Sequence, residues 1–331
     1  MRIPSIGRMS GTSALRTWWS QRPPATGAAV MATGILSVGL LLAGHRVLSR
    51  IALALAAAAW LGLVADAAVR APGWRGRGAD AALPLAALTP VAATAALGTA
   101  TAVQGGQSLA KALLALSVLL WAVLLLVVAR RWKRRMAGTV FLGCVATEGI
   151  ALLGAVLAVS AGAAWLAHTA LVFFWLGLVF YVVGLRCFDL RQVTRGAGDH
   201  WILGGGLAIA AVAGARLVLA SHRMYLWNND DRAALRGVTI ALLVLALVCY
   251  CLLAVAEVLR PRLGYDVRRW ATVFPMGMTA VASLSVATAL GVPWLRDLGR
   301  VLLWIAVAAW CVVLAGAVLS ASGGLRSRAP R

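Results

Sequence analysis

Apolar runs of about 20 residues recur along the whole chain, and short polar or basic connections separate them. A helix needs about 20 such residues to cross the hydrocarbon core of a bilayer, whereas a membrane β-strand needs only about ten. We therefore predict an all-α integral membrane protein with ten transmembrane helices. The predicted spans are residues 24–43, 51–69, 82–103, 109–129, 139–160, 164–185, 201–220, 237–259, 270–291 and 299–319.

The connections between these spans are too short to form a separate soluble domain. We divide the chain into an N-terminal tail (residues 1–23), a ten-helix transmembrane domain (residues 24–319) and a basic C-terminal tail (residues 320–331). The net charge is +21, yet 62% of the 331 residues are hydrophobic. The densest basic cluster, RRWKRR at residues 130–135, lies between two spans, which favours a membrane anchor over a nucleic-acid surface. We predict contact with a lipid bilayer and no nucleic-acid partner.

The distribution of lysine and arginine predicts the orientation, because cytoplasmic loops are enriched in these residues. With the N-terminus inside, 22 of the 31 lysines and arginines fall in cytoplasmic segments and nine remain on the other side. Both tails are then cytoplasmic. The first apolar run has no cleavage signature and is interpreted as a retained span. We predict a multi-pass protein of a plasma (inner) membrane.

Few residues suggest metal, cofactor or covalent chemistry. The cysteines form no C-x-x-C pair, and the histidines lack metal-ligand spacing. No zinc-protease, nucleotide-binding or nucleophile-elbow motif occurs, which argues against an ATP-driven pump and an intramembrane enzyme. We predict no enzyme activity, no cofactor and no metal site.

Odd-numbered and even-numbered spans differ in composition. The odd spans contain 15 serines and threonines, and the even spans contain three. Pro90 and Pro275 are predicted to interrupt odd spans, which suits helices that are buried or line a cavity. One interpretation is that small residues allow close helix packing. We favour the other, in which five helical hairpins place their odd members around a polar central pore.

Three motifs strengthen this interpretation. Residues 29–40, AVMATGILSVGL, resemble M-[GA]-T-G-I-x-S, and residues 199–217 resemble W-x-x-x-G-A-L-A-I-x-T-x-A-G. Residues 265–287, beginning YDVRRWATVFPMGMT, resemble Y-D-x-x-x-W-x-x-V-F-P-L-G-M-Y. In this order the motifs are similar to the tellurite-resistance/dicarboxylate transporter family, which includes the plant slow anion channels and their bacterial homologue. The resemblance implies five hairpins around a central pore, usually in a trimer.

The resemblance also implies an anion channel or secondary transporter. Its substrates would be small anions, such as C4-dicarboxylates, sulfite-like or tellurite-like oxyanions, or halides, with proton coupling as an option. The alternative is a membrane-embedded enzyme or assembly subunit that keeps the fold without transport. Two positions depart from the family pattern, since Glu148 replaces an amide and Thr279 replaces a tyrosine.

Phe274 is the predicted pore gate, together with the adjacent Pro275. Family members place a phenylalanine on this helix across the pore, and an aromatic ring can close a narrow pore sterically and by dewetting. The alternative is ordinary packing beside a proline. Arg216 is predicted either to concentrate anions at the outer end or to extend to the interface. The residues predicted to line the pathway are Thr33, Gly34, Ser37, Pro90, Glu148, Arg216 and Gly277.

Glu148 lies in the middle of the span at residues 139–160, where a carboxylate is costly and is usually functional. A position on an odd helix allows it to face the pore instead of lipid. One hypothesis is a protonation switch, because an ionised carboxylate repels anions and a neutral one can donate a hydrogen bond to them. The other is an acid that is always protonated and packed against hydroxyls such as that of Thr147.

Overall fold

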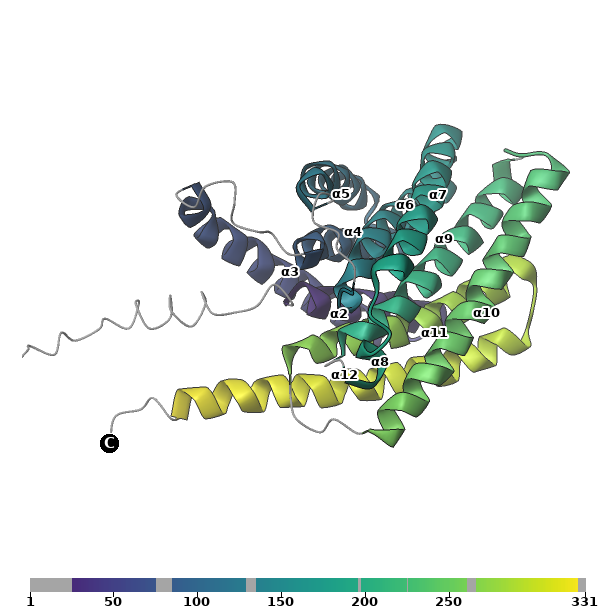
Figure 1. Cartoon of the computed structure of the whole chain (residues 1–331). Coiled ribbons are helices and arrows are strands. Elements are labelled where there is room, and N and C mark those ends of the chain that lie inside the picture. The colour runs from purple at the N-terminus through teal and green to yellow at the C-terminus, as the bar shows by residue number, and fades with distance from the viewer. Residues whose placement is uncertain are drawn as a thin grey trace, which may run out of the picture.

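The computed structural model describes residues 26–75, 85–128, 135–195, 198–224, 226–260 and 266–326. These residues form ten long helices, arranged as five consecutive antiparallel pairs (Figure 1), and a short helix, α8 (Gln192–Arg195). The pairs are α2 (Thr26–Leu42) with α3 (Arg46–Arg75), α4 (Thr89–Val103) with α5 (Gln107–Val128), α6 (Leu142–Ala161) with α7 (Ala164–Cys187), α9 (Ile202–Met224) with α10 (Asn229–Leu259), and α11 (Trp270–Leu290) with α12 (Trp294–Arg326).

The first helix of each pair is an inner helix, and the second is an outer helix. The inner helices α2, α4, α6, α9 and α11 pack against one another in that order, and α11 packs against α2, so they form a closed ring. Each outer helix packs on its own inner helix and on the next one in the ring. The predicted architecture of five hairpins around a central axis is therefore confirmed.

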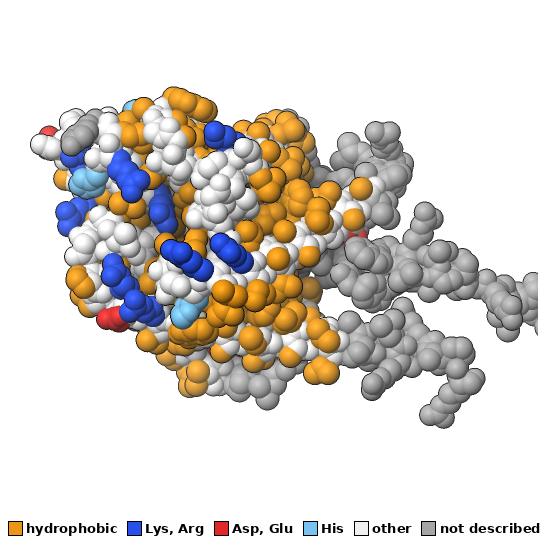
Figure 2. All heavy atoms as spheres, turned by 180° about the vertical axis from the view of Figure 1, so that it is seen from behind, with side chains coloured by type: hydrophobic (Ala, Val, Ile, Leu, Met, Phe, Trp, Pro, Cys, Tyr) orange, Lys and Arg blue, Asp and Glu red, His pale blue; other side chains and the backbone are white. Residues whose placement is uncertain are grey.

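Burial separates the two sets of helices as the compositional difference predicted. In the most apolar 18-residue windows, all residues of α6 and 83% of those of α9 are buried, against 11% in α3 and 17% in α12. Eight of the ten helices are long and apolar enough to cross a membrane, while α2 and α4 are shorter, with 17 and 15 residues. A broad hydrophobic surface on the outer helices is visible in Figure 2.

The hairpins share local features at both ends of the bundle. A 3₁₀ turn precedes four of the inner helices: η1 (Leu85–Leu88), η3 (Gly138–Phe141), η4 (Asp199–Trp201) and η5 (Val267–Arg269). We call the end of the bundle where the inner helices begin the N-face, and the opposite end, where they finish, the C-face. Four of the five turns at the C-face contain a glycine with positive φ, a conformation that readily ends a helix. These glycines are Gly44, Gly105, Gly162 and Gly291.

The observed helices correct several predicted boundaries. The prediction that Pro90 interrupts a span is wrong, because Pro90 lies in the first turn of α4, where its missing N–H costs no hydrogen bond. Pro275 does lie inside α11. The outer helices α3, α10 and α12 begin five to eight residues earlier than predicted, because their polar first turns are helical although they are not apolar.

Parts of the predicted domain division fall outside the described residues. The N-terminal tail and residues 130–134 of the basic cluster are among them. The predicted C-terminal tail starts inside α12, which continues to Arg326. The cytoplasmic position of both tails stays a prediction.

Candidate functional site

Two cavities follow one another along the axis of the inner ring. The first lies at the N-face and has a volume of about 60 Å³. All five hairpins contribute to its lining, which includes Ala28, Thr89, Thr139, Asp199 and Arg268. The second lies further along the same helices and has a volume of only about 10 Å³, about the room for one water molecule. Its lining includes Ile35, Ala96, Val145, Gly149, Ile209 and Met278. We call them the N-face cavity and the middle cavity.

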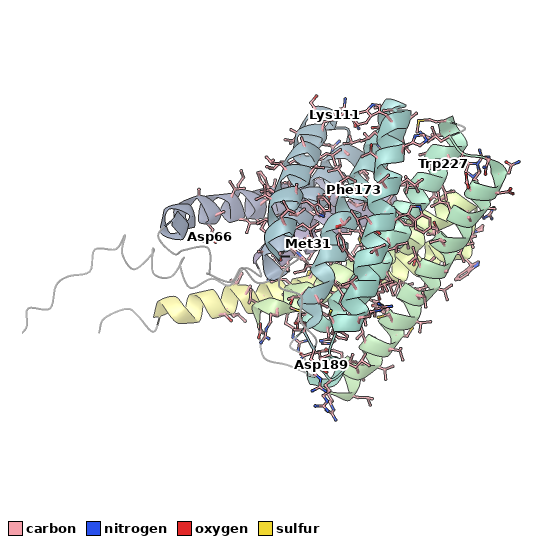
Figure 3. All side chains as sticks on the ribbon, turned by 45° about the horizontal axis from the view of Figure 1, so that its top comes forward. Met31, Asp66, Lys111, Phe173, Asp189 and Trp227 are labelled. Carbon is pink, nitrogen blue, oxygen red and sulfur yellow. The ribbon has the colours of Figure 1, made fainter. Side chains whose placement is uncertain are left out.

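Phe274 and Met31 line both cavities and therefore lie where the two meet. Both side chains are buried, with exposed fractions of 2% and 3%. Figure 3 shows Met31 in the interior of the bundle, with Lys111 and Trp227 toward the C-face and Asp189 toward the N-face. An aromatic ring and a thioether from neighbouring helices, α11 and α2, thus lie between the two spaces.

Two glycines allow the helices to approach closely around Phe274. A Cβ atom at Gly205 of α9 would lie 3.3 Å from Cε1 of Phe274 and 2.9 Å from Cγ of Pro275. A Cβ atom at Gly277 would lie 3.1 Å from Cγ2 of Ile35 on α2. Gly277 therefore serves the contact between α11 and α2, and Gly205 leaves room for the Phe274 ring.

The wall of the middle cavity is almost entirely apolar. Thr99 supplies the one hydroxyl among its described lining residues, and that hydroxyl donates to the carbonyl of Ala95 at 2.9 Å. This differs from the expected polar pore. The hydroxyls that distinguish the inner helices in sequence mainly donate to carbonyls of their own helix, because in a membrane interior no bulk water is present to satisfy them.

Three of these hydroxyls also accept a hydrogen bond from an outer helix. In each case an indole N–H of one hairpin donates to a threonine of the next inner helix, at 2.8–2.9 Å, and the threonine donates to the carbonyl four residues earlier. The bond from α12 to α2 links the last hairpin to the first, so it helps to close the ring. The pairs are Trp60 with Thr94, Trp121 with Thr147, and Trp310 with Thr33.

The residues predicted to line the pathway on α2 have other contacts. Thr33 is bonded to Trp310, and Gly34 lies against the backbone of Ala96 on α4, where a Cβ atom would be 3.5 Å from its carbonyl. Ser37 forms a buried cluster with Ser49 of α3 and Gln104, with hydrogen bonds of 2.7–3.3 Å. The described lining of the two cavities includes none of Thr33, Gly34 and Ser37.

Glu148 lies behind the pore wall. Its side chain has an exposed fraction of 0%, and a Cβ atom at Gly177 of α7 would lie 2.5 Å from its Oε1 atom. Neither carboxyl oxygen has a hydrogen-bond partner among the described residues. The next residue, Gly149, lines the middle cavity. The carboxyl group therefore faces the contact between α6 and α7 and not the cavity.

Pro90 and Arg216 also lie outside the described lining of both cavities. Pro90 follows Thr89, which lines the N-face cavity, at the start of α4. Arg216 lies on the C-face half of α9 and is partly buried, and its Nε atom has no hydrogen-bond partner in the part of the chain that the structure describes. Of the predicted site residues, Phe274 alone belongs to the described lining.

The described lining of the N-face cavity carries one arginine, Arg268, and one carboxylate, Asp199. Arg268 pairs with Asp266 at 2.8 Å, and the hydrogen bond from Arg268 lowers the pKa of Asp266 below its ordinary value. Asp199, which is buried, lines the same cavity. The first turns of the inner helices surround this cavity, and a helix N-terminus has a positive potential equivalent to about half an elementary charge. Among the described residues, no group of His, Cys, Asp or Glu could hold a metal ion.

Met31 and Gly205 lie beside Phe274 but are absent from the predicted site. Met31 occurs in the quoted motif two residues before Thr33, and Met31 and Ile35 are four residues apart, so they share a helix face different from that of Thr33 and Ser37. The prediction placed the hydroxyl-bearing face of α2 toward the axis, whereas the opposite face lines the cavities. The apolar pair Met31 and Ile35 was the feature of the sequence that marked this face.

The fold is therefore a membrane bundle in which five inner helices form a closed ring around an axis with two cavities. The family described as "Voltage-dependent anion channel" matches residues 21–318, which is most of the chain. The protein therefore belongs to this family, as the motifs suggested, and it is a multi-pass membrane protein of an anion channel and transporter family, whose members are not enzymes. No curated protein matches the chain.

Proposed function

We propose that this protein is a channel for small monovalent anions along the axis of the inner ring, and that Phe274 and Met31 close it. The observation that carries the proposal is the pair of aligned cavities that these two side chains separate. The helix N-termini around the N-face cavity favour anions. The apolar wall beyond it offers no fixed charge to hold an ion tightly, and conduction requires weak binding.

The same features favour halides and small oxyanions over C4-dicarboxylates. A dicarboxylate carries two separated charges and is best held by two cationic partners. The described lining of the middle cavity contains no lysine or arginine. A channel, which needs no strong substrate site, fits this wall better than a carrier.

Anion flux into liposomes that contain the purified protein tests the proposal. We expect the protein to admit chloride, nitrate and hydrogensulfite, and to admit malate more slowly. Empty liposomes measure the leak. Absence of flux for every anion tested, from protein that is monodisperse and folded, would contradict the proposal and favour an enzyme or assembly subunit with the same fold.

We propose that the N-face is cytoplasmic, that the protein resides in a plasma (inner) membrane, and that it is a homotrimer as the family resemblance implies. The excess of lysine and arginine in segments on the N-face side supports the orientation. A reporter that is active only outside the cytoplasm should then be silent at both termini. Cross-linking in intact membranes would reveal the trimer.

We also propose that protonation of Glu148 regulates the flux. An unpaired carboxylate at this buried position is costly, so ionisation would disturb the contact between α6 and α7 at Gly177. The nearest titratable neighbour on α6 is Cys144. Because Gly149 lines the middle cavity, a shift of α6 would change the width of the pore.

The variant Glu148→Gln keeps the size and the neutral state of the protonated acid. We expect wild-type flux to fall as the pH rises from about 5 to about 8, and the variant to keep its acid-side flux throughout, because only the wild-type side chain can ionise. Flux in liposomes clamped at each pH is the measurement. If the two pH profiles coincide, Glu148 is a structural acid.

A further inference from the structure

Three outer helices begin with two arginines that are four residues apart. All three helices start at the C-face, and the first member of each pair lies within the first four residues of its helix. Residues at i and i+4 lie on the same face of a helix, so each pair projects two like charges together. The pairs are Arg46 and Arg50 on α3, Arg232 and Arg236 on α10, and Arg296 and Arg300 on α12.

Helix stability does not explain these pairs. Cations are unfavourable at a helix N-terminus, and like charges at i and i+4 repel. Local partners offset only part of this, since Arg300 pairs with Asp297 at 3.2 Å and Arg232 donates to Ser221 and to the carbonyl of Trp227. The same destabilising pair of arginines occurs at the start of three helices, which indicates that these arginines have a role other than helix stability.

The C-face as a whole is basic. Figure 2 shows lysine and arginine side chains gathered at one end of the molecule, with few carboxylates among them. Besides the three pairs, this end carries Lys111, Arg216 and Arg223, against the carboxylates of Asp230, Asp231 and Asp297. Five of the six paired arginines are exposed to the surroundings, and Arg232 is half-buried.

The direction of the inner helices supplies a physical reason for this charge. All five inner helices end at the C-face, and a helix C-terminus has a negative potential equivalent to about half an elementary charge. The backbone alone would therefore attract anions at the N-face and repel them at the C-face. The hairpin turns are short, so the first residue of α3 follows the last residue of α2 by four positions, and the pairs lie beside these negative helix ends.

We propose that the three arginine pairs, on the neighbouring helices α10, α12 and α3, form an anion-collecting arc at the C-face. The arc offsets the negative helix ends and raises the local concentration of small inorganic anions at that mouth. This inference rests on the proposed function, because the anions collected are those that the pore conducts. Such a field acts over the Debye length, about 30 Å in 0.01 M salt and about 3 Å in 1 M salt, so the effect of the arc depends on ionic strength.

The test measures anion currents in planar bilayers, with chloride concentration and ionic strength set separately on each side. The gate-free background Phe274→Ala is compared with the same protein carrying Arg46→Gln, Arg50→Gln, Arg296→Gln and Arg300→Gln. In about 0.01 M salt we expect the current of anions that enter from the C-face to fall about threefold to tenfold. In about 1 M salt the difference should disappear. Anion entry from the N-face should change little.

A matched control replaces two exposed arginines of the N-face, Arg186→Gln and Arg191→Gln, and should leave entry from the C-face unchanged. Equal currents with and without the four C-face arginines in low salt would contradict the proposal that the arginine pairs collect anions. A current in the Phe274→Ala background would still support the proposed channel. A fall that is the same from both faces and varies with the anionic lipid content would show that the pairs bind lipid headgroups, and would also contradict the proposed role of the arginine pairs. Absence of current in the Phe274→Ala background would contradict both the proposed channel and the proposed role of the arginine pairs.

Discussion

Replacement of Phe274 by alanine is expected to raise the anion flux about tenfold or more, because the side chain lies where the two axial cavities meet and an aromatic ring there can close a narrow pore. The side chain has an exposed fraction of 2%, lines both cavities together with Met31 of α2, and lies close to Gly205 of α9. Truncation at Cβ joins the 60 Å³ and 10 Å³ cavities through the volume of the ring. The measurement is halide flux in liposomes at equal protein content.

The control for this prediction is Phe174→Ala on the outer helix α7. Phe174 is as buried as Phe274, with an exposed fraction of 0%, but it is not among the described lining residues. Both truncations are expected to cost about 3–5 kcal/mol of stability. Only Phe274→Ala should increase the flux, and Met31→Ala should give a smaller increase. A folded Phe274→Ala protein with unchanged flux would show that the gate lies elsewhere.

Gly138→Ala is expected to disrupt the N-face. A Cβ atom at Gly138 would overlap the backbone carbonyl of Asp199, where η3 of the third hairpin meets η4 of the fourth. Neither partner is a flexible side chain, so two inner helices must separate to make room. Overpacking of this kind costs about 1–3 kcal/mol and sometimes more. We expect a lower melting temperature and a lower yield of monodisperse protein.

Gly62→Ala is the matched control for this second prediction. Gly62 lies within helix α3, and a Cβ atom there would meet nothing within 4 Å. Alanine in a helix is favoured over glycine by about 0.5–1 kcal/mol, so this variant should be as stable as the wild type or slightly more stable. If Gly138→Ala behaves like Gly62→Ala, the contact between η3 and η4 is not tight in the folded protein.

The sequence determined the membrane class, the ten helices, their pairing and the division into inner and outer sets. This was possible because a bilayer requires long apolar helices and because buried helices tolerate hydroxyls, glycine and proline that lipid-facing helices lack. The motif around Phe274 also indicated the family, which the family match confirms, whereas the gate at Phe274 stays a prediction. Each of these features depends on local composition.

Only the tertiary structure decided which face of each inner helix meets the axis. Successive residues of a helix are turned by about 100°, so Glu148 faces Gly177 of α7 while its neighbour Gly149 faces the cavity. The inner helices are buried on every side, and their composition therefore does not distinguish the pore from a helix contact. Hydroxyls such as that of Thr33 are bonded within the protein wall, and the apolar Met31 lines the pore. The contacts that set these rotations join residues far apart in the sequence, as Trp310 and Thr33 do, and a local pattern does not encode them.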